Sequence, residues 1–439
     1  MPPPVASLDS DALSASSSAS DSASSAATSP ASSAADRCGG TARIAAGSAA
    51  FRRSNRALFF GGFSTFALLY CVQPLMPLLS HEFALSAAQS SMVLSCSTAA
   101  LALSLLASSV VSERLGRKPL MVGAMALAAL LTIACAGAHN YAQLLALRTL
   151  LGIALGGMPA IAMAYLGEEI EPNSLGLSMG LYISGSALGG MAGRVIASLL
   201  SDHFSWRLAL AVVGAAGVLA ALEFWRSLPA SRHFRPQHTA WRAMPAAFRG
   251  HWSDAGMPWL FALAFLLMGS FVSLYNYIGY RLLATPFSLS QSVVGALSLL
   301  YLLGIYSSVW AGRLADRYGR RHVLWTLIAI PPVGLLLTLS NWLPLIVFGV
   351  ALYTFGFFAA HSVASSWVGR RALGNRALAS ALYLFFYYFG SSVVGSLSGL
   401  MWESHGWPGV VLVLGSLLLL ALAIGWRLRQ LAPVAQADL

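Results

Sequence analysis

The sequence has 439 residues, of which 57% are hydrophobic and only 9% are charged. A soluble domain carries roughly 25% charged residues, so this composition excludes an ordinary soluble protein and favours a membrane protein. The net charge of +11 does not indicate nucleic acid binding, because the arginines occur in short clusters between apolar runs rather than in one long basic stretch.

The beginning of the chain is rich in serine and alanine, as in the stretch ASSSASDSASSAATSPASSAAD. Such a composition cannot bury enough apolar surface to fold. It also lacks the basic region and short apolar core of a signal peptide. We therefore expect residues 1–55 to form a disordered cytoplasmic tail.

Twelve apolar segments follow, each long enough to cross about 30 Å of hydrocarbon, which requires about 20 residues. The first six are 57–79, 88–111, 119–137, 141–166, 174–200 and 206–228, and the second six are 258–282, 290–311, 321–340, 342–366, 376–400 and 407–427. Pro74 and Pro77 should bend the first span, and Pro331 and Pro332 the ninth. The sequence predicts an all-α membrane protein with two six-helix bundles, 56–228 and 257–428.

The distribution of basic residues predicts the orientation of these spans. An even number of spans places both ends on one side, and Lys and Arg accumulate on the cytoplasmic side. A cytoplasmic N-terminus places 22 of the 26 basic residues in cytoplasmic segments. We therefore expect residues 229–256 to be a cytoplasmic linker whose basic and aromatic residues lie along the lipid headgroups, and residues 429–439 to be a cytoplasmic tail.

The two predicted bundles repeat each other at a nearly constant offset. The pairs separated by 203 residues are Glu113 and Asp316, Arg114 and Arg317, and Gly116 and Gly319, and the pair separated by 202 is Gly193 and Gly395. An offset shared by loops and spans predicts two homologous, pseudo-symmetric halves. Parallel halves around a site at the membrane midplane are typical of secondary transporters.

Several motifs resemble one transporter family. GRLADRYGRR (Gly312–Arg321) resembles the loop signature between spans 2 and 3 of the major facilitator superfamily, here in its second-half position. SVVSERLGRK (Ser109–Lys118) is the first-half copy, with Ser109 and Glu113 in place of Gly and Asp. LRTLLG (Leu147–Gly152) resembles the embedded-arginine motif of the twelve-span drug:proton antiporter branch, and LYNYIGYRL (Leu274–Leu282) resembles the YnfM group of bacterial inner-membrane transporters. The resemblance implies a monomeric inner-membrane transporter with both termini cytoplasmic.

The two repeated loops are the candidate gating elements. In each, an acid precedes an arginine by four residues, a spacing worth about 0.2–0.5 kcal/mol in a helix, and a glycine permits a tight turn. By resemblance, these loops bias the inward–outward equilibrium; the alternative is a solvated, positively charged loop. The candidate gating residues are Glu113, Arg114, Gly116, Arg117, Gly312, Asp316, Arg317, Gly319, Arg320 and Arg321.

Polar residues inside the spans are the candidate substrate and proton sites. Arg148 and Arg194 each cost about 2.5–3.5 kcal/mol at a helix centre, so they either face a cavity, where they attract anionic groups or proton-linked partners, or snorkel outward. No Asp or Glu lies mid-span, so His361, with an unperturbed pKa of about 6.5, is the candidate proton carrier. The alternative is a hydrogen-bonded packing residue, which a lone histidine often is. The remaining candidates, which could instead form interhelical hydrogen bonds, are Gln73, Asn276, Tyr277, Tyr387 and Tyr388.

Glycines in the fifth span predict close helix packing. Gly185, Gly189 and Gly193 have overlapping GxxxG spacing, and Gly395 occupies the repeated position in the second half. The proline that the antiporter motif normally places in this span is missing between Ala187 and Met191, which weakens the inference of antiport.

The sequence as a whole predicts a secondary active transporter that exports a small drug-like molecule, sugar or nucleoside by proton-coupled alternating access. The alternatives are uptake, facilitated diffusion, or a receptor of the same fold that transports nothing. An enzyme is not expected, because the sequence contains no GK[ST] P-loop and no zinc-protease motif. We expect no cofactor or metal beyond the proton gradient, and no nucleic acid partner.

Overall fold

The computed structural model describes residues 43–234, 244–372 and 376–431, which belong to one folded unit. The first half contains α1 (Ala49–Tyr70), η2 (Gln73–Leu75), α2 (Met76–Glu82), α3 (Ala87–Leu115), α4 (Arg117–Ala136), α5 (Tyr141–Leu155), α6 (Pro159–Glu169), α7 (Pro172–His203) and α8 (Trp206–Ser227). After the short helix α9 (Met244–Trp252), the second half contains α10 (Met257–Leu283), α11 (Gln291–Ala296), η3 (Leu297–Leu300), α12 (Tyr301–Tyr318), α13 (Arg320–Ile328), α14 (Ile330–Leu337), α15 (Leu343–Arg371) and α16 (Arg376–Gln430).

Ten helical segments of the described chain are long and apolar enough to cross a membrane. Two of the predicted spans are not counted separately. The ninth is divided between α13 and α14, directly before Pro331, and the last two are joined in α16, where Gly406 is non-helical with φ +60°. Together with these bent segments, the ten helices are consistent with a twelve-helix fold, and the expected all-α membrane architecture is confirmed.

The start of α1 corrects the predicted tail. Ser48 caps the helix by accepting a hydrogen bond from the backbone N–H of Phe51, whose side chain is buried. Before it, the backbone N–H of Ile44 donates to the carbonyl of Glu169 at 2.8 Å. The disordered tail was therefore predicted to extend too far, because residues 43–55 dock on the first half; residues 1–42 lie outside the described chain.

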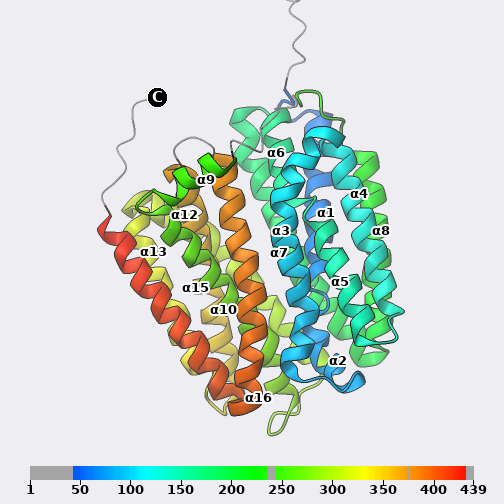
Figure 1. Cartoon of the computed structure of the whole chain (residues 1–439), viewed down its shortest axis with the longest axis vertical. Coiled ribbons are helices and arrows are strands. Elements are labelled where there is room, and N and C mark those ends of the chain that lie inside the picture. Colours follow the sequence, from blue (N-terminus) through cyan, green and yellow to red (C-terminus); the bar gives the residue numbers. More distant parts are fainter. Residues whose placement is uncertain (1–42, 235–243, 373–375, 432–439) are drawn as a thin grey trace, which may run out of the picture. The chain divides into compact units, whose positions relative to one another are not determined.

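Figure 1 shows that both ends of the described chain lie at the same end of the bundle, together with α9. We call this the α9 end, and the opposite one, which holds α2, the α2 end. The arrangement agrees with an even number of crossings, and the assignment of the α9 end to the cytoplasm stays a prediction. Large apolar side chains such as Leu103, Leu219 and Leu412 are exposed, as expected of a surface that faces lipid.

Candidate functional site

Arg194 of α7 lies at the boundary between the two halves. It is 3% exposed. Its Nη1 donates to the carbonyl oxygen of Gly190 at 2.6 Å, and its Nε donates to Oε1 of Gln73. The guanidinium carbon lies 4.3 Å from the ring centroid of Tyr70 on α1 and 4.8 Å from that of Tyr301 on α12. Tyr70 belongs to the first half and Tyr301 to the second, so the guanidinium makes a cation–π contact with each half.

Gln73 extends this contact into a hydrogen-bonded chain across the boundary. Its Nε2 donates to Oδ1 of Asn276 on α10 at 2.7 Å and to the carbonyl of Val272 at 3.3 Å. Beside the chain, Tyr275 and Arg194 help line a cavity of about 20 Å³, which is room for about one water molecule. The structure thus brings together three of the predicted cavity residues in one network.

Arg148 of α5 is fully buried and serves a different group of acceptors. Its Nε donates to the carbonyl of Val93 at 3.2 Å, its Nη1 to Leu68 at 3.1 Å and its Nη2 to Leu69 at 2.6 Å. Leu68 and Leu69 belong to the last turn of α1, whose carbonyls have no partner within the helix and carry partial negative charge. Arg148 therefore ties the end of α1 to α3 and α5.

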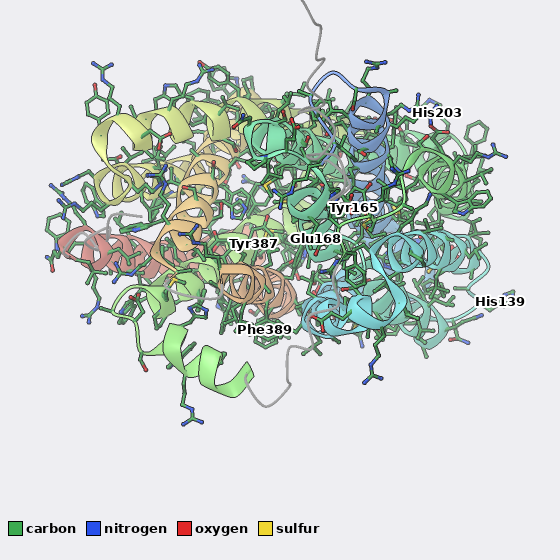
Figure 2. All side chains as sticks on the ribbon, turned by 90° about the horizontal axis from the view of Figure 1, so that it is seen from above. His139, Tyr165, Glu168, His203, Tyr387 and Phe389 are labelled. Carbon is green, nitrogen blue, oxygen red and sulfur yellow. The ribbon has the colours of Figure 1, made fainter. Side chains whose placement is uncertain are left out.

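His361 of α15 lies in an aromatic cluster. Its Nδ1 is 3.0 Å from the hydroxyl of Tyr383, and its ring centroid is 4.6 Å from that of Tyr387. Figure 2, which looks onto the α9 end, shows Tyr387 toward the middle of the bundle and Phe389 of the same helix at its edge. The structure therefore places His361 beside Tyr387 and the hydroxyl of Tyr383.

The last two predicted cavity residues have other contacts. The hydroxyl of Tyr277 donates to the carbonyl of Gly395 at 2.7 Å, which joins α10 to α16. Tyr388 is buried and packs edge-on against Tyr387, with ring centroids 5.1 Å apart. The sequence reasoning missed Tyr70, Tyr275 and Tyr301. Tyr70, three residues before Gln73, and Tyr275, next to Asn276 in the stretch LYNYIGYRL, had a signal in the sequence, whereas Tyr301 had none.

The two halves are joined mainly at the α2 end. The hydroxyl of Tyr280 on α10 lies 2.7 Å from that of Ser80 and 2.5 Å from that of Ser90. Asp202 at the end of α7 accepts from the backbone N–H of Ser292 at 3.1 Å. As far as the described residues go, the side-chain hydrogen bonds between the halves all lie toward this end. In Figure 1, α3 and α16 run side by side and come closer together toward the α2 end.

At the α9 end, the ion pairs described for Arg117 and Asp316 of the repeated loops lie within one half. Asp316 pairs with Arg320 at 2.7 Å, the predicted spacing, and with Arg370 of α15 at 3.6 Å. Arg117 pairs with Glu168 of α6 at 2.7 Å. The first loop thus pairs with α6 through its arginine, and the second pairs with α15 through its aspartate.

The other gating candidates lie around these loops. Arg321 donates to the carbonyl of Leu431 at 3.2 Å, and the guanidinium of Arg317 lies 5.2 Å from the ring centroid of Tyr318. Arg114 and Glu113 lie in the last turn of α3, and Gly312 lies within α12.

Both loop glycines have the same unusual backbone conformation. Gly116 and Gly319 each have φ +84°, where a β-carbon is strained by about 1–3 kcal/mol. We expect Gly319→Ala to lower the stability of the protein by that amount, measured by thermal unfolding in detergent. Gly312→Ala is the matched control, because Gly312 is helical and an added β-carbon would meet nothing within 4 Å. An equal loss in both variants would contradict the expectation.

The linker is attached to both halves. Carboxylate oxygens of Glu169 accept from the backbone N–H groups of Arg232 and His233 at 2.6 and 2.8 Å. At the other end of the linker, Asp254 pairs with Arg371 of α15 at 2.6 Å. Partial burial alone would raise the pKa of the Asp254 carboxyl. The hydrogen bonds from Arg371 and from the backbone of Gly256 and Met257 outweigh burial and hold this pKa below its ordinary value.

A depressed pKa in the folded state makes the Asp254 contact a source of acid sensitivity. The contact is complete above the ordinary carboxyl pKa of about 3.9 and is lost as the pH falls through the folded value. We expect Asp254→Asn to lower stability at neutral pH by about 1–3 kcal/mol, because Arg371 is left buried without its charged partner. Thermal unfolding between pH 7 and pH 3 checks this: the variant and wild type should converge toward acid pH, and a constant difference would contradict it.

Comparison with known proteins places both sequence and fold among membrane transporters. The profile of the Major Facilitator Superfamily matches residues 58–281 and 277–438. The inner membrane transport protein YnfM of Escherichia coli (strain K12) is 50% identical over 387 residues, 88% of this chain and 93% of YnfM. The uncharacterized MFS-type transporter YybF of Bacillus subtilis (strain 168) is 47% identical over 379 residues, 86% of this chain and 94% of YybF.

Solved structures share the fold at much lower identity. A bacterial homolog of the human lysosomal transporter Spinster has a TM-score of 0.73 at 14% identity, covering 86% of this chain and 96% of its own. A mutant of the nucleoside transporter NupG has a TM-score of 0.72 at 15% identity, covering 85% and 99%. The expected resemblance to the superfamily and to YnfM is confirmed, whereas these matches do not distinguish the drug:proton antiporter branch.

Proposed function

We propose that this chain, which belongs to the Major Facilitator Superfamily of membrane transporters, exports a small organic molecule across the inner membrane by alternating access. The observation that carries the proposal is the asymmetry of the boundary between the halves. Side chains cross it toward the α2 end, whereas the ion pairs described at the α9 end, those of Arg117, Asp316 and Arg371, lie within one half or bind the linker. Such an arrangement suits a carrier closed toward one side of the membrane.

The basic residues predict that the α9 end is cytoplasmic, so the structure corresponds to an inward-facing or closed state. Opening the α2 end would break the Gln73–Asn276 hydrogen bond and those of Tyr280 with Ser80 and Ser90. Each of these hydrogen bonds stabilises the closed state by about 0.5–1.5 kcal/mol net. Substrate binding or an ion gradient can supply the free energy needed to break them.

The export we propose is driven by protons. His361 supports it, because its imidazole contacts the Tyr383 hydroxyl and the Tyr387 ring near the middle of the bundle. Facilitated diffusion is the second candidate. One observation supports facilitated diffusion: none of the described ion pairs places a carboxylate beside Arg148 or Arg194, where an antiporter could carry its proton.

Growth inhibition of cells with and without the protein tests transport directly. The panel should contain drugs, dyes, sugars, nucleosides and organic acids, each with and without a protonophore. We expect at least one compound to accumulate less in expressing cells, and the protonophore to abolish that difference. A difference that survives the protonophore would leave facilitated diffusion, and a panel without any difference would argue for a non-transporting protein.

Closure of the α2 end is tested by cross-linking across it. Asp202→Cys and Ser292→Cys place two thiols where the carboxylate now accepts from the backbone. A short bifunctional thiol reagent should stop transport by the double variant, and each single variant should keep its transport under the same treatment. Undiminished transport by the cross-linked protein would show that the α2 end does not need to open.

A further inference from the structure

The two buried arginines differ in how their charge is compensated. Every nitrogen of the Arg148 guanidinium donates to a backbone carbonyl. For Arg194, the described hydrogen bonds use Nε and Nη1, and its faces are covered by the rings of Tyr70 and Tyr301. Arg148 is therefore satisfied by the fold itself, whereas Arg194 retains donor capacity at the boundary between the halves.

Arg194 also lacks a negative partner within the described chain. The cationic members of the described ion pairs are Arg56, Arg117, Arg207, His233, Arg320, Arg370 and Arg371. Its hydrogen-bond acceptors are an amide side chain and a backbone carbonyl, both neutral. A buried cation without a counter-charge is costly, and a bound anion would remove that cost.

Two further buried polar atoms near this network have no hydrogen-bond partner among the described residues. One is the hydroxyl of Tyr70, whose ring covers the guanidinium, and the other is Nδ2 of Asn276, a residue that lines the small cavity with Arg194 and whose Nδ2 lies toward Gly395 of α16. Both atoms can donate to an oxyanion. The Tyr301 ring and the neighbouring Tyr275 ring, 5.3 Å apart between centroids, supply apolar surface on the second half. A cation, free donors and aromatic walls together fit an anionic group on an apolar body.

Access to this group requires movement between the halves. The cavity of about 20 Å³ holds about one water in the present conformation. Arg194 belongs to the first half and Tyr301 to the second, so separating the halves withdraws the Tyr301 ring and uncovers one face of the guanidinium. The charged group is thus covered and uncovered by the motion that alternating access requires.

We infer that the transported molecule is a small organic anion, whose oxyanion pairs with Arg194 and whose apolar body packs against the tyrosines of both halves. The inference rests on the proposed transport function and names its substrate class. The Tyr70 hydroxyl donates to the same oxyanion, and Gln73 keeps the guanidinium in place.

Binding of matched probes to the full-length protein in lipid nanodiscs tests this inference. The probes are benzoate, phenylacetate and 3-phenylpropanoate, each compared with its neutral amide and with the corresponding protonated amine. Binding is measured as a concentration-dependent rise in unfolding temperature. We expect the acids to bind at least tenfold more tightly than the amides or amines. Equal or tighter binding of the amides or amines, or no binding by any probe, would overturn the anionic assignment.

Variants connect the binding to Arg194. Arg194→Gln should weaken binding of the acids at least tenfold, and Arg194→Lys should restore part of that loss. Arg207 is an exposed arginine at the α2 end, so the Arg207→Gln variant should bind the acids as tightly as wild type. Wild-type binding of the acids by Arg194→Gln would overturn the inference. Should Arg194→Gln not fold, the comparison of probes on the wild-type protein still decides it. The growth panel judges transport separately, so anion binding can fail while transport of a neutral or cationic compound is established.

Discussion

Replacing Arg148 with alanine should leave the chain inserted in the membrane but lower its stability by several kcal/mol and abolish transport. The guanidinium is fully buried and donates to three carbonyls on two helices. A hydrogen bond from a charged donor contributes about 1.5–3 kcal/mol, and its loss takes from the buried carbonyls of Leu68, Leu69 and Val93 their only charged donor among the described residues. The end of α1, which carries Tyr70 and leads into Gln73, would lose its attachment to α5.

Thermal unfolding of the purified protein measures this loss, and membrane fractionation confirms insertion. Arg148→Lys should recover only part of the stability, because one ammonium group cannot replace a planar fork that reaches three separate acceptors. Arg207→Gln is again the control, since Arg207 is exposed and its pair with Glu82 lies at the surface, where ion pairs contribute little. A wild-type unfolding temperature for Arg148→Ala would show that the carbonyls find other donors.

The sequence predicted the helical architecture because a membrane span has a local signature. About 20 apolar residues in a row, with arginines between the runs, need no knowledge of the partner helices. The loop turns were predictable for the same reason: Gly116 and Gly319 recur at one offset, and both adopt a positive φ. The tail boundary was not, because the segment near Ile44 is held by Glu169, far along the chain.

The roles of the charged residues depend on distant contacts and were therefore less predictable. Asp316 and Arg320 pair within one helical turn, as their spacing indicates. The partner of Arg117 is Glu168, 51 residues away on another helix, which no local spacing reveals. Arg148 and Arg194 looked alike in sequence, as two arginines inside spans. Their difference arises because one meets the open carbonyls at the end of α1 and the other meets two tyrosine rings.

Gly189→Ala should be as damaging as the loss of Arg148, although it adds a single methyl group. Gly185, Gly189 and Gly193 follow one face of α7, which packs directly on the backbone of α1. A β-carbon at Gly189 would lie 1.9 Å from the carbonyl oxygen of Phe63 and 2.5 Å from its carbonyl carbon. No rotamer relieves a contact with backbone, so α1 and α7 must separate, at a cost of about 1–3 kcal/mol or more.

The separation would also reach the candidate site, because Arg194 lies on α7 while Tyr70 and Gln73 lie on or just after α1. We therefore expect Gly189→Ala to lower both the unfolding temperature and transport. Gly180→Ala on the same helix is the matched control: an added β-carbon there meets nothing within 4 Å, and alanine favours a helix over glycine by up to about 1 kcal/mol. The two substitutions should thus shift the unfolding temperature in opposite directions. A shared direction would mean that helix propensity, rather than the approach of α7 to α1, decides the stability of this half.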